Sequence, residues 1–386
     1  MAVYDRLLGL LDQSADEIAD RERSSAYSQR ILHADRVVIY GAGKLGQKIA
    51  AGFKAEGKSI EAFIDSNRKR WGTSIDGVEV LELRNAANRF SDCLAVVAVW
   101  NVGGTTTYEH IEPMLRHHGF AAVAPGINAL RLYPDRFLPH WKIDAAAGVL
   151  TAKSEILDAF NLWSDARSRD LFVDHVEYLL SPTHVSWRNT ASVEDQYFID
   201  SIIRLSNQEA FVDCGAYDGD SGRAFLRKCH DRFKRLTCFE PDPHNFVKIT
   251  GWRDSLAADV AQKVDLVEAC VAAENGEVTI DPSGTTGSTI GEAGTHRVRS
   301  VRLDDALTVA PTFIKYDIEG FEPYALAGTE ATIRKHRPKV AICVYHHQNH
   351  LWKLPLQLSA IAENYSFHLE QHGVGTSDTV CYALPR

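Results

Sequence analysis

The stretch Ala210-Phe-Val-Asp-Cys-Gly-Ala-Tyr-Asp-Gly219 decides the fold of the rear half of the chain. It predicts a short buried strand that ends at Asp213 and runs into a tight glycine turn. A second apolar run, Leu236 to Phe239, ends in an acid, Glu240. In a doubly wound α/β sheet, an acid about 20 residues beyond a glycine turn holds the hydroxyls of a ribose. The spacing therefore predicts an α/β domain with a nucleoside-type ligand.

The charge of this turn narrows the choice of ligand. Asp213, Asp218 and Asp220 lie close together, and no Lys or Arg lies between Asp213 and Ser221. Such an acidic loop repels a pyrophosphate but suits a ligand with a cationic amino group and a sulfonium. The turn therefore favours S-adenosylmethionine and methyl transfer. A tight strand–helix connection without any ligand stays open as the alternative.

Composition argues against several classes of protein. The chain has 386 residues, 45% of them hydrophobic, which predicts two domains or three with ordinary cores. A formal charge of −9 argues against nucleic acid or an anionic membrane as the main partner. No apolar run approaches the roughly 20 residues of a membrane span, and no secretory signal is visible. The seven cysteines form no C-x-x-C pair, which fits a reducing cytoplasm; five of them lie in apolar runs and are expected to be buried thiols: Cys214, Cys238, Cys270, Cys343 and Cys381.

Apolar runs alternate with helical patterns along most of the chain, which predicts parallel sheets covered on both faces. We expect an α/β protein with two doubly wound domains joined by a helical connector. The expected order is an N-terminal helical segment (1–33), a Rossmann-like nucleotide-binding domain (34–140), the connector (141–206) and a second domain (207–386). Strands are expected in the first domain at Arg36–Tyr40, Ile60–Ile64, Leu94–Val99 and Ala121–Val123, and in the second at Ala210–Cys214, Leu236–Phe239, Asp265–Val271, Thr312–Asp317, Lys339–Tyr345, Ser366–Gln371 and Thr379–Ala383.

The Rossmann-like domain opens on a different glycine turn. Gly41-x-Gly43-x-x-Gly46 follows one predicted strand, and Asp65 ends the next. This is the spacing of a dinucleotide fingerprint, with Lys44 in the turn and no acid, so a phosphate would suit the helix N-terminus. The pattern predicts a second site, for a nucleotide or a sugar nucleotide. Hydride chemistry with NAD(P) and a purely structural turn stay open.

A third element lies in the rear domain. Thr312-Phe-Ile-Lys-Tyr-Asp-Ile-Glu-Gly320 places Asp317 at the carboxyl end of a fourth strand, where open sheets bind ligands. Strand alternation puts Lys315, Asp317 and Glu319 on one side, an arrangement that is unfavourable in a buried setting unless these groups pair or contact a ligand. A structural Lys315–Asp317 ion pair is the alternative.

In combination, these motifs resemble the FkbM-type methyltransferases, from about residue 195 to the C-terminus. The resemblance implies a class I methyltransferase domain with a seven-stranded, mostly parallel sheet. It also implies an S-adenosylmethionine-dependent O-methyltransferase that acts on a hydroxyl of a sugar, polysaccharide or related metabolite. The segments that carry it are Asp195-Gln-Tyr-Phe198, Phe211-Val-Asp-Cys-Gly-Ala-Tyr-Asp-Gly-Asp220, Phe239-Glu-Pro-Asp-Pro243, Val301-Arg-Leu-Asp-Asp305, Ile314-Lys-Tyr-Asp-Ile-Glu-Gly320 and Arg337-Pro-Lys339.

The resemblance also implies roles for single residues. Asp317 would lie nearest the methyl group. His350 is a departure, because the family tends to carry an acid just before the Leu-Trp pair. The front half is similar instead to nucleotide-binding domains that some such enzymes carry ahead of their catalytic part. The expected cofactor contacts are Asp213, Gly215, Ala216 and Gly219 around the methionine end, Glu240 at the ribose and Val271 against the adenine.

Methyl transfer to a hydroxyl is an in-line displacement, which alignment and a base promote. His346, just past the fifth strand, is our first candidate for the base, Asp317 is the second, and Glu319 joins them as a catalytic candidate. A packing role for His346 stays open. His346-His347-x-x-His350 has neither regular spacing nor an acid partner, so we predict no metal cluster there. A magnesium ion on Asp317 and Glu319 stays open.

Three functions are consistent with the sequence. The leading one is the O-methyltransferase, with a small-molecule or carbohydrate acceptor. The second is a bifunctional enzyme whose front domain carries out NAD(P)-dependent sugar-nucleotide chemistry. The third is a non-catalytic metabolite-binding protein. The oligomeric state stays open.

Overall fold

The chain forms two compact units in the computed structural model, and each is described by itself. The first comprises Met1–Lys153, Val173–Arg188 and Val374–Ser377; the second comprises Ser154–Phe172, Asn189–Gly373 and Asp378–Arg386. The domain limits expected from the sequence stay a prediction. The residues that the structure describes are 2–99, 108–140, 143–181, 190–282, 289–290, 296–373 and 377–386.

The described part of the first unit holds a six-stranded sheet in the order β3-β4-β2-β1-β5-β6. All neighbours are parallel except β3 and β4, which form a hairpin. Its turn, Asp76-Gly77, has positive φ at both residues, a hairpin signal that the sequence analysis did not use. The other four strands confirm the predicted ones to within two residues. The strands are β1 (Arg36–Tyr40), β2 (Ser59–Ile64), β3 (Ser74–Ile75), β4 (Val78–Leu81), β5 (Leu94–Val97) and β6 (Ala122–Pro125).

Helices cover both faces of this sheet. Val37 and Ile39 of β1 pack in one cluster with Phe53 of α4, whereas Val38 packs in a second cluster with Ile111 of α6. Alternate residues of one strand are therefore buried on opposite faces, as in a doubly wound domain. The helices are α1 (Ala2–Leu11), α2 (Ala15–Ser24), α3 (Ala26–His33), α4 (Lys44–Ala55), η1 (Arg68–Arg70), α5 (Leu83–Phe90), α6 (Tyr108–His117), α7 (Gly126–Leu132), α8 (Pro134–Phe137) and α9 (Ala146–Thr151).

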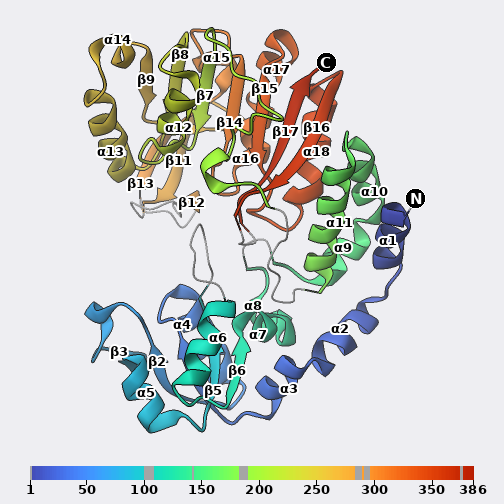
Figure 1. Cartoon of the computed structure of the whole chain (residues 1–386), viewed down its shortest axis with the longest axis vertical. Helices are drawn as coiled ribbons and strands as arrows, with labels where there is room; N and C mark the ends of the chain where they lie inside the picture. Colours follow the sequence, from blue (N-terminus) through green and yellow to red (C-terminus); the bar gives the residue numbers. More distant parts are fainter. Residues whose placement is uncertain are drawn as a thin grey trace. The chain divides into compact units, whose positions relative to one another are not determined.

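A seven-stranded sheet forms the centre of the second unit, within its described residues, in the order β16-β17-β15-β14-β7-β8-β9 (Figure 1). All neighbours are parallel except β17, which runs antiparallel to both β15 and β16. This confirms the predicted seven-stranded sheet and its final antiparallel pair. The strands are β7 (Ala210–Cys214), β8 (Arg235–Phe239), β9 (Val264–Val267), β14 (Phe313–Tyr316), β15 (Lys339–Cys343), β16 (Tyr365–Gln371) and β17 (Thr379–Pro385).

The predicted strand Asp265–Val271 is wrong as a single element. The N–H of Ala269 donates to the carbonyl of Val267, a tight turn that ends β9. The chain then enters β10, which pairs with β13 in a separate sheet of order β10-β13-β11-β12 that the sequence analysis missed. The stretch 283–294, which is rich in Gly, Thr and Ser, lies outside the described residues except for β12. The remaining strands are β10 (Cys270–Val271), β11 (Gly276–Asp281), β12 (Thr289–Ile290) and β13 (His296–Val301).

An aromatic cluster anchors β7 and β14. Phe211 of β7 contacts Phe225 of α12 and Phe313 of β14, with ring centroids 4.9 and 5.0 Å apart, and all three are buried. This packing fixes the two strands whose ends carry Asp213 and Asp317. The helices of this unit are α10 (Lys153–Leu162), α11 (Ala166–Leu180), which the division between units crosses, η2 (Val193–Asp195), α12 (Asp220–Cys229), α13 (Pro243–Asp254), α14 (Ala258–Ala261), α15 (Leu303–Ala306), α16 (Glu322–Ala327), α17 (Glu330–His336) and α18 (His350–Ile361).

Two predictions about the chain's chemistry can be compared with the fold. All seven cysteines are buried free thiols, which confirms the prediction made for the five in apolar runs. In the described segments, no helix combines the length and the apolar character that crossing a membrane would require.

Candidate functional site

The candidate site lies where the order of strands reverses. β7 lies between β8 and β14 in the sheet. The strands that follow it in the chain are added first on the β8 side and later on the β14 side, so the strand order reverses at β7. Open α/β sheets bind ligands beyond the carboxyl ends of the strands at such a switch point. Asp213 lies at the end of β7, Glu240 follows β8 and Asp317 follows β14. The sheet therefore brings these three predicted residues to one edge.

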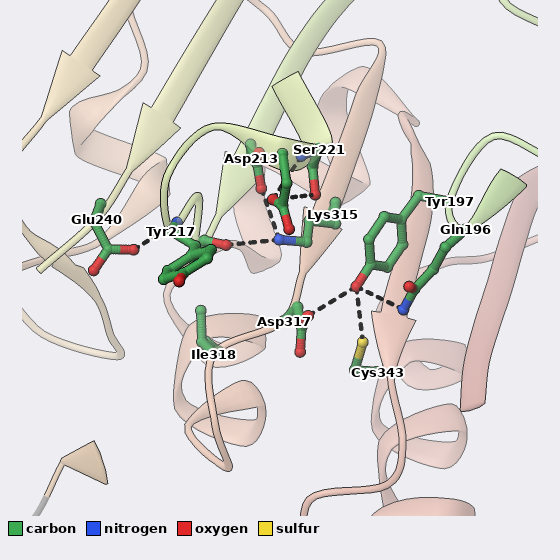
Figure 2. Close-up of polar contacts among 12 residues, drawn as sticks. Gln196, Tyr197, Asp213, Tyr217, Ser221, Glu240, Lys315, Asp317, Ile318 and Cys343 are labelled. Atoms are coloured by element: carbon green, nitrogen blue, oxygen red, sulfur yellow. Dashed lines mark hydrogen bonds and ion pairs between the residues drawn. The ribbon is translucent and has the colours of Figure 1, made fainter. Parts of the chain in front are cut away.

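Asp213 forms a buried ion pair with Lys315 (Figure 2). The Lys315 Nζ lies 2.9 Å from Asp213 Oδ1 and also donates to the Gly215 carbonyl at 2.7 Å. Burial raises the pKa of Asp213 to about 6, although Lys315 opposes the shift. Burial alone would lower the pKa of Lys315, but Asp213 and two further acids outweigh it and raise that pKa. Lys315 thus makes its ion pair with Asp213, not with Asp317 as the structural alternative supposed.

The other carboxylate oxygen of Asp213 is an unmatched acceptor. Asp213 is fully buried, and its Oδ2 has no hydrogen-bond partner among the described residues. Leaving a buried polar atom without a partner is unfavourable by about 1–3 kcal/mol. A ligand with a hydrogen-bond donor would satisfy it.

The glycines of this turn are required by packing within the protein. At Gly215, φ is +83° and an added Cβ would lie 1.9 Å from the Asp317 carbonyl oxygen. At Gly219, φ is +89° and a Cβ would lie 2.5 Å from the Trp252 ring. Ala216, between them, is buried, and its N–H donates to the Phe239 carbonyl. These residues shape the turn, whether or not they also contact a ligand.

The turn is less acidic than its sequence suggests. Arg223 of α12 lies 2.6 Å from Asp218, and Lys315 pairs with Asp213. Two of the three acids therefore have cationic partners from outside the turn, while Asp220 is exposed. Glu240 and Asp317 add two further acids at this edge. The edge still favours a cationic ligand.

Glu240 is held by backbone donors. Its two oxygens accept hydrogen bonds from the N–H groups of Tyr217, at 2.8 Å, and Asp242, at 2.9 Å. Burial raises the pKa of Glu240 to about 7, although these donors oppose the shift. Val271 is also buried, but it lies on β10 in the four-stranded sheet instead of continuing β9.

Asp317 is oriented by two tyrosines that the sequence analysis missed. The Tyr197 hydroxyl donates to Oδ2 at 2.8 Å (Figure 2), and the Tyr345 hydroxyl donates to Oδ1 at 3.2 Å. Burial would raise the pKa of Asp317, but Lys315, His346 and Tyr197 outweigh it, so the pKa is lowered. The Asp317 side chain remains 24% exposed and so can be reached from solvent. Tyr197 lies in the segment Asp195–Phe198, which carries part of the family resemblance, so the sequence did offer a signal for this residue.

His346 faces three carboxylates. Its Nδ1 lies 2.8 Å from Glu322 Oε1, and its Nε2 lies 3.4 Å from Asp317 and 3.8 Å from Glu319. Burial would lower its pKa, but Glu322, followed by Glu319 and Asp317, raises it to about 9. A ring that keeps its proton at neutral pH is a poorer proton acceptor than the sequence analysis expected.

Glu319 occupies an unusual backbone position. Its φ is +54°, and Gly320 follows with φ of +101°. Burial raises the pKa of Glu319 to about 7, against the opposing effect of His346. A non-glycine residue in the left-handed region is uncommon and is often found at functional sites. The catalytic candidates Asp317, Glu319 and His346 therefore lie together.

The first unit has its own glycine turn, between β1 and α4. A Cβ at Gly41 would lie 2.9 Å from the Ala98 carbonyl oxygen, and one at Gly46 would lie 1.9 Å from that of Gly41. At Gly43, the first residue before α4, a Cβ would meet no atom within 4 Å among the described residues. Packing explains two of the glycines and leaves space at Gly43.

Asp65 is already occupied by contacts within the protein. Its Oδ2 accepts from the Ala42 N–H at 2.9 Å and lies 3.1 Å from Arg70, and its Oδ1 accepts from the Asn67 N–H. Arg70 belongs to the basic η1 segment. Asp65 therefore connects the glycine turn to the segment after β2. A ribose that bound to Asp65 would have to do so alongside these existing contacts.

Comparison with known proteins agrees with this geometry. Residues 213–370 match the methyltransferase FkbM domain. The chain thus carries an FkbM methyltransferase domain at these residues, and this match supports a methyltransferase. No curated protein sequence matches the chain at a significant level.

A solved structure shares the fold of the whole chain. The methyltransferase FkbM from Methylobacillus flagellatus KT is 21% identical, with a TM-score of 0.76 over 99% of each chain. A putative rRNA methylase from Clostridium thermocellum is 8% identical and covers 49% of this chain and 92% of its own, with a TM-score of 0.32. A UDP-D-quinovosamine 4-dehydrogenase from Vibrio fischeri is 25% identical over 22% of this chain and 73% of its own, with a TM-score of 0.20. The last two scores are too low to support an argument.

Proposed function

We propose that this protein is an S-adenosylmethionine-dependent O-methyltransferase that methylates a hydroxyl of a sugar, a polysaccharide or a related metabolite. The observation that carries the proposal is the meeting of Asp213, Glu240 and Asp317 at the ends of three neighbouring strands, at the switch point of the sheet. Such an edge suits a ligand with a ribose and a positive charge.

The residues fit the donor molecule. Asp213 Oδ2 is a buried acceptor without a hydrogen-bond partner among the described residues. The ammonium group of the methionine part is a hydrogen-bond donor with the opposite charge. Glu240 is fixed by two backbone N–H groups, which leaves lone pairs for ribose hydroxyls. Val271 offers an apolar surface for the adenine. When bound, S-adenosylmethionine supplies the methyl group on a cationic sulfur.

The chain's own residues would then align the acceptor. Asp317 is held by Tyr197 and Tyr345, so its carboxylate has a fixed direction. Because its side chain is partly exposed, an incoming hydroxyl can donate to it and pass it the proton as the oxygen is methylated. Glu319, 20% exposed beside it, offers a second acceptor. Two carboxylates suit a polyol, whose hydroxyl groups are donors, which favours a carbohydrate acceptor.

Asp317 is less suited to magnesium. Two tyrosine hydroxyls and an imidazole surround it, and these would have to move for an octahedral ion with several waters to bind.

Isothermal titration with S-adenosylhomocysteine tests the donor site. We expect micromolar-range binding in the native protein and at least tenfold weaker binding in Glu240→Ala. Glu330→Ala, which removes an exposed acid of α17, is the control and should bind as the native protein does. Absence of binding heat in the folded native protein would rule out the proposal.

Product analysis tests the acceptor. Mass spectrometry after incubation with S-adenosylmethionine and a panel of sugars and polysaccharides should detect an added methyl ether. Asp317→Asn should reduce the yield at least a hundredfold while leaving S-adenosylhomocysteine binding within threefold of native. Methylation of amines alone would contradict the O-methyl assignment.

A second candidate function concerns the first unit, which we propose binds a nucleotide or a sugar nucleotide through its phosphates. The open space at Gly43 and the uncapped start of α4 support it, because the backbone N–H groups there can face an anion. NADH fluorescence and titration with a UDP-sugar would each report binding, lost in Gly43→Asp. Binding of NADH would favour the bifunctional alternative, and no binding of either ligand would leave the turn structural.

A further inference from the structure

Behind Asp317 lies a buried cluster that methyl transfer does not use. Glu322 begins α16, His346 follows β15 and His350 begins α18. Their side chains are 0%, 2% and 4% exposed. One possible ligand atom from each lies within 4.8 Å of the others. Two imidazoles and a carboxylate converge from three separate elements.

Several polar atoms of this cluster have close neighbours but no well-directed hydrogen bond. Glu322 Oε2, His346 Nδ1 and His350 Nδ1 are all buried, and none has a well-directed hydrogen bond with any described residue. Three such atoms in one place would be unfavourable, because buried polar groups are nearly always satisfied. A cation among them would satisfy all three at once.

The spacing of Glu322 Oε2 and His350 Nδ1 suits a small transition-metal ion. Glu322 Oε1 lies 2.8 Å from His346 Nδ1, and Oε2 lies 3.4 Å from His350 Nδ1. Zinc binds nitrogen and carboxylate oxygen at about 2.0–2.2 Å in a tetrahedron, which separates neighbouring ligands by about 3.4 Å. Imidazole with one carboxylate is a donor set that zinc and related ions favour over magnesium or calcium.

Neighbouring groups hold His346 and Glu322 in place. His346 Nε2, the nitrogen away from Glu322, faces Asp317 Oδ1 at 3.4 Å and Glu319 Oε2 at 3.8 Å. A metal-bound histidine usually donates its other N–H to a carboxylate. Glu322 is fixed in turn, because its Oε1 accepts from the Ile318 N–H at 3.0 Å.

We propose that Glu322, His346 and His350 form a site for a divalent transition-metal ion, of which Zn²⁺ is the best-matched example. The ion binds His346 at Nδ1, which keeps a proton on Nε2 facing Asp317. His346 is then a positioning residue for that carboxylate, and Asp317 is left as the group that receives the acceptor's proton. This inference does not depend on the identity of the methyl donor or acceptor.

The competing explanation is an ion pair without metal, in which a protonated His346 lies against Glu322. It accounts for His346 and one oxygen of Glu322. It leaves Glu322 Oε2 and His350 Nδ1 facing each other at 3.4 Å with no hydrogen bond to a described residue. The metal accounts for all of these atoms.

Zinc binding by the full chain tests the site. The purified protein is treated with a chelator, dialysed and titrated with Zn²⁺ in competition with a chromogenic chelator. We expect one ion per chain with a submicromolar Kd, and at least a hundredfold weaker binding in Glu322→Gln and in His350→Gln. Circular dichroism would show which variants are folded.

His336→Ala is the matched control, because His336 is an exposed histidine at the end of α17 and does not belong to the cluster of Glu322, His346 and His350. It should bind Zn²⁺ as the native protein does. The proposal is overturned if the folded native protein binds no Zn²⁺, or if folded Glu322→Gln and His350→Gln bind it as tightly as native protein. Because the readout is metal binding, a failure here leaves the methyl-transfer test untouched, and the reverse also holds.

Discussion

Lys315 is the residue around which the acidic edge is organised. It is the buried cation of the switch point, it pairs with Asp213, and it also binds the carbonyl of Gly215. Its charge lowers the pKa of Asp317, against the effect of burial, so Asp317 keeps its negative charge. Without Lys315 the buried Asp213 would lose the cation that it pairs with.

Removing this cation should therefore destabilise the second unit. Lys315→Met leaves Asp213 as an uncompensated buried charge, so we expect a loss of about 3–5 kcal/mol in the free energy of unfolding, measured by urea denaturation. Replacing both partners, in Asp213→Leu with Lys315→Met, should recover most of that loss. Arg334→Met is the control, because its ion pair with Glu330 is exposed and should contribute less than about 1 kcal/mol. A loss for Lys315→Met as small as the control's would contradict the role given to this pair.

Glu240 should make donor binding depend on pH. Its folded pKa is about 7, above the usual 4.5, so near pH 6 most of the free protein carries a protonated Glu240. Ribose hydroxyls donate to the ionised form, so binding lowers this pKa and releases a proton, and affinity rises as pH increases through 7. We expect S-adenosylhomocysteine to bind roughly tenfold more tightly at pH 8 than at pH 6. In Glu240→Gln the two affinities should be nearly equal, and an unchanged pH dependence in this variant would assign it to another group.

The sequence was enough to locate single acids but not their partners. Asp213, Glu240 and Asp317 were predictable because each follows an apolar strand, and parallel strands end at one edge. The pairs Lys315–Asp213 and Arg223–Asp218 depend on side-chain direction, which alternation alone does not give. Glu322 was missed as a partner of His346 because it begins a separate element, α16, which precedes β15 in the chain.

At the scale of elements, the glycine turn connects β7 to the loop after β14. The carbonyl of Asp317 occupies the space that a side chain at Gly215 would need. The same loop carries Glu319 and Gly320 with positive φ. The residues that follow β7 and β14 thus pack closely against each other, which fixes the position of Asp317 relative to Asp213.

Two glycine substitutions should distinguish a glycine that packing requires from one that only lowers the stability of a helix. Gly215→Ala places a Cβ 1.9 Å from a backbone oxygen at positive φ, so we expect a loss of at least about 2 kcal/mol in the free energy of unfolding. Gly251→Ala, inside α13 with nothing within 4 Å among the described residues, should instead gain about 0.5–1 kcal/mol. Urea denaturation measures both. Similar effects of the two substitutions would show that the turn is not tightly packed.

Elements were predictable where burial was strong. In the seven-stranded sheet, β15 and β17 are nearly continuous apolar runs, and β7 and β14 are buried along their whole length. β11 and β13 of the four-stranded sheet have exposed residues at their starts, so their patterns are weak. The break after β9 depends on one local hydrogen bond, from Ala269 to Val267, that no apolar pattern signals.

At the scale of the whole molecule, the chain contains two α/β units, each with a glycine turn after its first sheet strand. The turns differ in chemistry: Gly41–Gly46 carries lysine, and Asp213–Asp220 carries acids. The structure from Methylobacillus flagellatus KT matches the chain over 99% of its length, so this two-unit architecture recurs. Alternation of apolar strands with helices predicted the main sheet of each unit, apart from the β3–β4 hairpin, but not the four-stranded sheet.

The central claim is that the acidic edge of the second unit holds a cationic methyl donor. A crystal structure with S-adenosylhomocysteine bound tests it most directly. The account predicts the ribose hydroxyls on Glu240, the amino group on Asp213 and the sulfur beside Asp317. A diphosphate ligand such as NAD lying over Gly215–Gly219, or S-adenosylhomocysteine bound away from these three acids, would contradict it.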